Sequence, residues 1–233
     1  MMFESLEGRR LLSGVVVTAL GDTVIYQLPD SGAALHVIEI PVGTGATPTV
    51  FAVDASGQLP GVYSGINHII IQGGAGNDII HYSGDTVGAT ITGGAGNDTI
   101  VVDASNGAAS PACFIDGGDG NDFIVVTGGT GDTIFGGNGD DTLASGGGID
   151  QLIDGGNGKD SILSLDISST VTGGNGKDFL AVLSADSTLP SNGTDRVVVV
   201  VFDPMTGAAV DPQAAAIVSQ VQAVLNSPSI TLF

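Results

Sequence analysis

Aromatic and basic residues are both scarce in this chain. It has no Trp, aromatic residues make up 5% of it, and 5 Lys and Arg stand against 25 Asp and Glu, which gives a formal net charge of −20. So few aromatic side chains argue against a conventional thick hydrophobic core. The negative charge makes nucleic acid and anionic membranes poor partners, and it favours a cation as the ligand.

Cysteine, histidine and long apolar runs are scarce too. Cys113 is the only cysteine, which excludes an intramolecular disulfide framework and a thiolate metal site. The three histidines, His36, His68 and His81, follow no metal-ligand spacing, so structural roles are expected for them. No apolar run approaches the roughly 18 residues that span a bilayer, so we expect no transmembrane segment.

Glycine, in contrast, is abundant, with 38 residues, and much of it recurs in one hexapeptide, Gly-Gly-x-Gly-x-Asp. The hexapeptide occurs six times, and its copies begin at Gly73, Gly93, Gly117, Gly136, Gly155 and Gly173. The steps between these starts are 20, 24, 19, 19 and 18 residues. Such a period indicates a solenoid whose coils each consist of two short halves.

If each coil has two corners, the six loops stack on one edge of the solenoid. The opposite corners are then expected near Gly84-Asp85, Asn106-Gly107, residues 128–132, residues 146–150 and Asp166. Only residues 128–132 and 146–150 keep a shortened loop. The spacing therefore predicts one complete metal-binding edge and one partial edge.

Aliphatic residues at matching loop positions support the stacking. The second residue after each loop Asp is Ile80, Ile100, Ile124, Leu143, Ile162 or Leu180, and the shortened loops give Ile134 and Leu152. Two residues before each full loop stand Ile71, Ile91, Ile115, Ile134, Ile153 and Val171. Side chains repeated in this way form interior ladders, which stabilise short strands that cannot bury a face alone.

The expected fold is all-β, a parallel β-roll or β-helix solenoid. We expect an N-terminal tag at residues 1–14, disordered, then β-rich N-terminal coils at 15–70 and repeats at 71–182. A C-terminal cap at 183–233 is expected to hold a strand over 196–203 and a helix from Pro212 to Leu225. Either the helix or the strand is expected to cover the last coil's exposed edge.

The loops carry the chemistry expected of a calcium site. Glycines let the backbone turn and aim carbonyl oxygens into one cavity, while the Asp supplies charge. Calcium takes about six to eight oxygen ligands, more than one hexapeptide provides, so two stacked loops must share each ion. Six loops enclose five gaps, which predicts up to five calcium ions on the complete edge.

The predicted carboxylate ligands on the complete edge are Asp78, Asp98, Asp122, Asp141, Asp160 and Asp178. Carbonyl ligands are expected from the first and third loop positions, at Gly73, Ala75, Gly93, Ala95, Gly117, Asp119, Gly136, Asn138, Gly155, Asn157, Gly173 and Asn175. One further site is expected between Asp132 and Asp150 on the partial edge. Lys159 and Lys177, at position five, are expected to point outward and reduce repulsion between loops.

Residues 71 to 182 resemble the RTX, or hemolysin-type, calcium-binding repeat, whose consensus is G-G-x-G-x-D-x-U-x. The resemblance implies a parallel β-roll, calcium between loops of alternate half-turns, and an extracellular or cell-surface setting. Phe3 to Ser13 resemble a short N-terminal tag, roughly F-E-x-L-E-x-R-x-L-L-S, of some bacterial surface or exported proteins. A frayed polar terminus is the alternative for that segment.

Calcium binding coupled to folding is therefore the expected function, with a cell-surface or extracellular-matrix partner left open. A structural or adhesive surface protein that calcium merely stiffens is one alternative. A carbohydrate-active solenoid enzyme is another, but no clustered base or cation suits such chemistry, so we expect no enzymatic activity.

Overall fold

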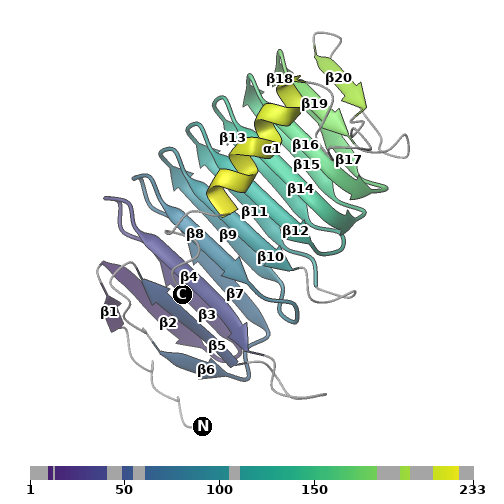
Figure 1. The fold of residues 1–233 in the computed structure, drawn as a ribbon. Helices are drawn as coiled ribbons and strands as arrows, with labels where there is room; N and C mark the ends of the chain where they lie inside the picture. The colour runs from purple at the N-terminus through teal and green to yellow at the C-terminus, as the bar shows by residue number, and fades with distance from the viewer. Residues whose placement is uncertain are drawn as a thin grey trace.

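The chain winds into coils whose strands build two facing sheets (Figure 1). The structure, a computed structural model, describes residues 10–12, 14–40, 49–54, 61–104, 111–182, 195–199 and 212–225. Nearly every coil places one strand in each sheet, and neighbouring coils pair in parallel. The predicted all-β parallel roll is thus confirmed.

Each sheet is built of ten strands. In spatial order, the first sheet holds β1 (Arg10–Leu12), β2 (Val15–Leu20), β3 (Thr23–Gln27), β7 (His68–Gln72), β9 (Ala89–Ala95), β11 (Phe114–Asp119), β13 (Thr133–Asn138), β15 (Leu152–Gly158) and β17 (Thr170–Thr172), with β18 (Asn175–Gly176) also paired to β15. The second sheet holds β20 (Arg196–Val199), β19 (Phe179–Val182), β16 (Ser161–Ile167), β14 (Thr142–Ile149), β12 (Phe123–Gly128), β10 (Thr99–Ala104), β8 (Ile79–Ser83), β4 (Ala34–Ile40), β5 (Thr49–Asp54) and β6 (Val62–Ser64).

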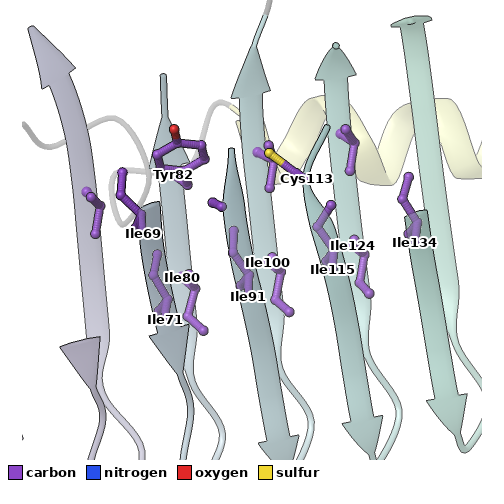
Figure 2. Packing of buried hydrophobic residues seen from close by; sticks show 14 of the residues in the cluster. Ile69, Ile71, Ile80, Tyr82, Ile91, Ile100, Cys113, Ile115, Ile124 and Ile134 are labelled. Carbon is purple, nitrogen blue, oxygen red and sulfur yellow. The ribbon is translucent and has the colours of Figure 1, made fainter. Parts of the chain in front are cut away.

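The interior between the sheets is filled by aliphatic ladders. In the first sheet, Ile91 pairs with Ile115 and Ile115 with Ile134, and in the second sheet Ile100 pairs with Ile124. These side chains are at most 1% exposed, and Figure 2 shows them repeating from coil to coil. Because strand residues alternate between faces, a coil of fixed register places one aliphatic residue at the same interior position each time.

One predicted ladder member, Leu152, does not lie in the interior. It is 39% exposed, and its neighbour Ile153 pairs with Ile134 instead. The cause is the length of this coil. β14 pairs with β12, and β15 with β13, at a constant offset of 19 residues, so Leu152 lies opposite Thr133, whereas matching residues 146–150 to 128–132 assumes an offset of 18. A difference of one residue in register moves the expected side chain to the other face of the strand.

The N-terminal end continues both sheets before it closes with antiparallel strands. β3 pairs in parallel with β7, and β4 pairs in parallel with β8, so residues 23–40 form a coil without a glycine hexapeptide. β1 and β2 then extend the first sheet antiparallel, while β5 and β6 extend the second. Arg10–Leu12 is therefore a strand, which corrects the expectation of disorder for these three residues; residues 1–9 lie outside the described residues.

The C-terminal end carries the predicted strand and helix. β20 pairs in parallel with β19, and α1 (Pro212–Leu225) lies across the outer face of the second sheet (Figure 1). Ile217 of α1 is 3% exposed and packs with Val125, Ala144 and Leu163 of that face. β20 thus covers the edge of the last coil, whereas the helix covers an outer sheet face. Residues 200–203 of the expected strand lie outside the described residues. In the described part of the chain, no helix is long and apolar enough to cross a membrane.

Candidate metal centre

The six hexapeptide loops connect strands of the first sheet to strands of the second and stack along one edge, which we call the metal edge. The stacking is so close that only glycine fits at some positions. Gly137 has a φ of +110°, and a Cβ there would lie 2.1 Å from the carbonyl oxygen of Gly118 in the loop below. The glycines thus allow both the turn and the contact between coils.

The loop aspartates form a hydrogen-bonded ladder along the metal edge. The Oδ1 atom of each Asp accepts the backbone N–H of the Asp one coil earlier, at 2.7 to 2.9 Å. The ladder joins all six predicted carboxylates, Asp78, Asp98, Asp122, Asp141, Asp160 and Asp178. The side chains predicted from the sequence are therefore brought together in one row.

The second carboxylate oxygen, Oδ2, is what marks the row as a candidate metal centre. In Asp98, Asp122, Asp141, Asp160 and Asp178 this atom is buried and has no hydrogen-bond partner among the described residues. A buried acceptor without a donor is costly unless a cation or a water satisfies it. Because five such atoms recur in one ladder, the same need for a cation or a water recurs from coil to coil.

A backbone oxygen faces the same space as the Oδ2 atoms of Asp98, Asp122, Asp141 and Asp160. A Cβ built on Gly136 would lie 2.5 Å from the Oδ2 atom of Asp141 and 2.4 Å from the carbonyl oxygen of Gly155 in the next coil. Gly93 and Gly117 show the same arrangement. Carboxylate and carbonyl oxygens from two coils therefore converge on one small space, and oxygen is the ligand that calcium prefers.

Electrostatics point the same way. Burial raises the pKa of Asp98, Asp122 and Asp160 to about 6 and that of Asp141 to about 7. These values already include two smaller contributions: neighbouring carboxylates raise the pKa, and the hydrogen bond from the preceding Asp N–H lowers it. These sites disfavour an uncompensated negative charge, so a bound cation would stabilise the ionised form.

The first loop differs from the other five. Both carboxylate oxygens of Asp78 are satisfied, Oδ1 by the N–H of Ala33 at 2.6 Å and Oδ2 by the N–H of Gly74 at 2.9 Å. Gly94 and Gly96 have positive φ angles, whereas Gly74 does not. The Oδ1 contact with Ala33 continues the ladder into the N-terminal coil, whereas the Oδ2 contact is made within the first loop itself; the sequence revealed neither contact.

Positions three and five of the loops form two further ladders. At position three, Asn138 donates to Asp119 at 2.7 Å and Asn157 donates to Asn138 at 2.8 Å. At position five, the side chain of Asn97 accepts the N–H of Asn121 at 2.8 Å. Asn or Asp recurring once per coil was the available signal for these contacts. Both predicted outward lysines, Lys159 and Lys177, are exposed.

The second edge has its own ladder, with a different membership from the one expected. Asp132 accepts the N–H of Cys113 at 2.7 Å, and the Oε1 atom of Gln151 accepts the N–H of Asp132 at 2.8 Å. Gln151 thus occupies the position expected for Asp150, because the coil repeats after 19 residues and not after the 18 that separate the two glycine-rich segments. Asp150 is exposed with a φ of +58° and does not join Asp132 in the ladder.

Gln151 also supplies a donor where the metal edge has only acceptors. Its Nε2 atom donates to the carbonyl oxygen of Gly128 at 3.3 Å. The Nε2 atom of Gln151 therefore has a hydrogen-bond partner at the position where an Asp of the metal edge has an Oδ2 atom without one. The Oδ2 atom of Asp132 is still buried and lacks a hydrogen-bond partner in the described chain.

Glu39 closes the second edge of the first repeat coil without metal chemistry. Its carboxylate accepts the N–H groups of Thr86 and Val87, both at 3.0 Å, the hydroxyl of Thr86 at 2.7 Å and the hydroxyl of Tyr82. Glu39 is 9% exposed, so a full set of donors is what makes its burial tolerable. Nothing in the local sequence pairs Glu39 with residues more than 40 positions away.

The histidines lie apart from both edges. The rings of His36 and His81 stack at 4.0 Å between centroids, and His36 is buried, which lowers its pKa to about 4. His68 is on β7 in the other sheet. No group of three or more His, Cys, Asp or Glu residues that could hold a metal ion occurs in the described ranges. Any ion on the metal edge must therefore take backbone oxygens as well as carboxylates.

Comparison with protein-family models matches the RTX calcium-binding nonapeptide repeat, in 4 copies, to residues 70–86, 90–107 and 116–152. Neither the curated proteins nor the solved structures gave a significant match. The matched residues include the first four hexapeptide loops, and the last two loops repeat the same ladder beyond them. RTX repeats bind calcium, and this β-roll carries their loops in register. Residues 70–152 of the chain thus contain RTX-type calcium-binding repeats.

Proposed function

We propose that calcium ions lie in the gaps between successive loops of the metal edge, from Asp98 to Asp178. The observation that carries the proposal is the row of buried Oδ2 atoms without hydrogen-bond partners, each facing a carbonyl oxygen of the next coil. Four gaps have such an atom and two complete hexapeptides, namely 98/122, 122/141, 141/160 and 160/178. Calcium suits them because it accepts carboxylate and carbonyl oxygens in flexible geometry.

The gap between Asp78 and Asp98 is excluded from the proposal, although the sequence predicted an ion there. Both carboxylate oxygens of Asp78 already accept N–H groups, so an ion would have to displace one of these hydrogen bonds. The second edge is excluded too, because Gln151 is neutral and Asp150 lies outside the ladder. We assign the carbonyl ligands to the first and third loop positions of the remaining loops.

Calcium binding is further proposed to drive folding of the roll. Without a cation, the four gaps hold stacked carboxylates that repel one another. With a Kd near 10⁻⁴ M, calcium at about 1 mM contributes about 1.4 kcal/mol per site, or about 6 kcal/mol for four sites. This sum is comparable to the whole stability of an ordinary domain. In cytosolic calcium the contribution would almost vanish.

This calcium requirement supports an extracellular or cell-surface setting, where calcium is abundant. There the chain would serve as a calcium-stiffened structural or adhesive rod. We propose binding and structural service over catalysis, because the buried charged residues of the metal edge are acidic ladder members, and Lys159 and Lys177, the cations of these loops, are exposed at position five. The absence of enzymatic activity stays a prediction.

Native mass spectrometry of the purified chain, combined with circular dichroism, tests the proposal. We expect several calcium ions per chain, and loss of the strand signal in excess chelator that is reversed by calcium. Magnesium at the same concentration is the control, because it prefers rigid octahedral sites and retains its water. A chain that binds no calcium would refute the proposal, and an unchanged strand signal in chelator would refute the coupling to folding.

A further inference from the structure

The metal edge does not end at the last glycine hexapeptide. β20 pairs in parallel with β19, with Arg196 opposite Phe179 and Val197 opposite Leu180. The N–H of Arg196 donates to the carbonyl oxygen of Asp178 at 2.7 Å, just as the N–H of Phe179 donates to Asp160 at 2.8 Å. Asp195, which precedes Arg196, therefore stands in the same register as the ladder aspartates.

Asp195 also makes the ladder hydrogen bond. Its Oδ1 atom accepts the N–H of Asp178 at 3.3 Å, the same contact that Asp178 offers to Asp160 at 2.9 Å. The step from Asp178 to Asp195 is 17 residues, close to the 18 of the coil before it. The contact is longer than those inside the roll, as expected where a coil is held from one side only.

Asp178 supplies the observation that points to a ligand. It is 2% exposed, and its Oδ2 atom is buried without a hydrogen-bond partner in the described part of the chain. Within the roll, the Oδ2 atom of each Asp faces the gap toward the following coil, as Asp141 does toward Gly155. The Oδ2 atom of Asp178 therefore faces the gap that Asp195 closes.

The sequence before Asp195 keeps part of the loop pattern. Asn192 and Gly193 stand at the third and fourth positions relative to Asp195, as Asn175 and Gly176 do relative to Asp178. Pro190 and Ser191 replace the glycine pair, so the complete hexapeptide does not recur here. Residues 183–194 lie outside the described residues, so the site is defined by its two carboxylates.

We infer that Asp178 and Asp195 hold an additional divalent cation of the calcium class, at the C-terminal end of the metal edge. The inference rests on the proposed function of the edge. With this site the row again has five positions, but it is displaced by one coil from the row that the hexapeptides predict: it begins at Asp98 and ends at Asp195.

The site connects calcium binding to the C-terminal cap. The Arg196 guanidinium lies 4.9 Å from the centre of the Phe179 ring, and its Nη1 atom donates to Gln213 of α1 at 2.9 Å. An ion that fixes Asp195 thus fixes the residue that joins the last coil to the helix. Calcium would then order the cap together with the roll.

The test is the substitution Asp195→Asn, which removes the charge but keeps the Oδ1 acceptor for the N–H of Asp178. We expect native mass spectrometry to count one calcium ion fewer per chain than in the wild type. The matched control is Asp22→Asn, which removes one charge from the exposed turn before β3, at the opposite end of the strands from the metal edge, and should leave the count unchanged.

Three outcomes would overturn the inference. An equal count for wild type and Asp195→Asn would remove this site while leaving the proposed function intact. A wild-type count of zero would remove both. Should the variant fail to fold, the wild type decides: the amide resonance of Arg196 must shift on calcium titration, and an unmoved resonance in a chain that binds calcium elsewhere would refute the site.

Discussion

Asp141 lies in the middle of the metal edge, so its substitution by Asn should change stability in opposite directions with and without calcium. Asn keeps the Oδ1 acceptor that binds the N–H of Asp122 at 2.8 Å. It replaces the buried Oδ2 atom by an amide NH₂ group, which removes one negative ligand and adds a donor that faces the Gly155 carbonyl. Asp141→Asn should therefore lose one ion while retaining the ladder.

In calcium, the variant should be less stable. At about 10 mM calcium and a Kd near 10⁻⁴ M, one site contributes about 2.7 kcal/mol. For a chain of this size that loss lowers Tm by about 5 to 10 °C. The measurement is thermal unfolding followed by circular dichroism in saturating calcium.

In chelator at pH 8, the same variant should be more stable than the wild type. Burial and the neighbouring carboxylates raise the pKa of Asp141 to about 7, from an ordinary value of 3.8, so its ionisation at pH 8 opposes folding. At about 1.4 kcal/mol per tenfold change this cost is about 4 kcal/mol, which solvent screening reduces to about 2 kcal/mol. Asn avoids the cost, so the folded-to-unfolded ratio should rise by a factor of about 30.

Asp140→Asn is the matched control, because Asp140 is adjacent, exposed, and accepts the N–H of Lys159 through an oxygen that Asn retains. It removes the same charge without touching the buried Oδ2 row, so neither large effect is expected. If Asp140→Asn and Asp141→Asn changed stability alike in both media, general charge reduction would explain the data and the reasoning from the buried oxygen would be refuted.

Three more predictions follow from the two edges. In excess EDTA, the circular dichroism signal of the strands should be stronger at pH 5 than at pH 8. The pKa values of the buried metal-edge carboxylates reach about 6 to 7 in the fold, so proton binding stabilises the metal-free roll at low pH, and this stabilisation is lost as pH rises through that range. A signal independent of pH would contradict the prediction. Gln151→Glu replaces an amide donor by a carboxylate of the same shape and should add one calcium ion in native mass spectrometry, whereas an unchanged count would show that the second edge cannot hold one. Glu39→Gln leaves donors such as Thr86 N–H poorly matched and should cost about 1 to 3 kcal/mol in urea unfolding, equally in calcium and in EDTA; a loss seen only in calcium would link Glu39 to the ions.

The coil architecture could be predicted because it is written locally and repeatedly. Each coil repeats the same order of aliphatic residue, glycine loop, Asp and aliphatic residue, and a fixed register turns that order into a ladder. Ile115, for example, lies opposite both Ile91 and Ile134, as its position in the repeat predicts. The helix start at Pro212 followed from equally local signals.

The second edge could not be predicted in the same way, because its glycines do not mark the register. Residues 146–150 match residues 128–132 at an offset of 18, but β14 and β15 pair with β12 and β13 at an offset of 19, which places Gln151 in the ladder and leaves Asp150 and Leu152 exposed. Counting from the glycine residues does not reveal this difference of one residue. Glu39 and its partners in residues 85–87 are likewise far apart in sequence and meet only through the parallel pairing of β4 with β8.

The sequence by itself determined the kind of fold, the identity of the metal edge and the chemistry of its ligands, since spacing and residue type suffice to stack glycine loops and align their aspartates. Only the tertiary structure decided which carboxylate oxygens still need a cation. The Oδ2 atom of Asp78 accepts the N–H of Gly74 in its own loop, and Asp178 gains Asp195 from a later strand, so the two ends of the row differ from the loops between them. The physical reason is that a hydrogen-bond donor satisfies a buried oxygen only from a particular position in space, and that position depends on how the whole chain packs.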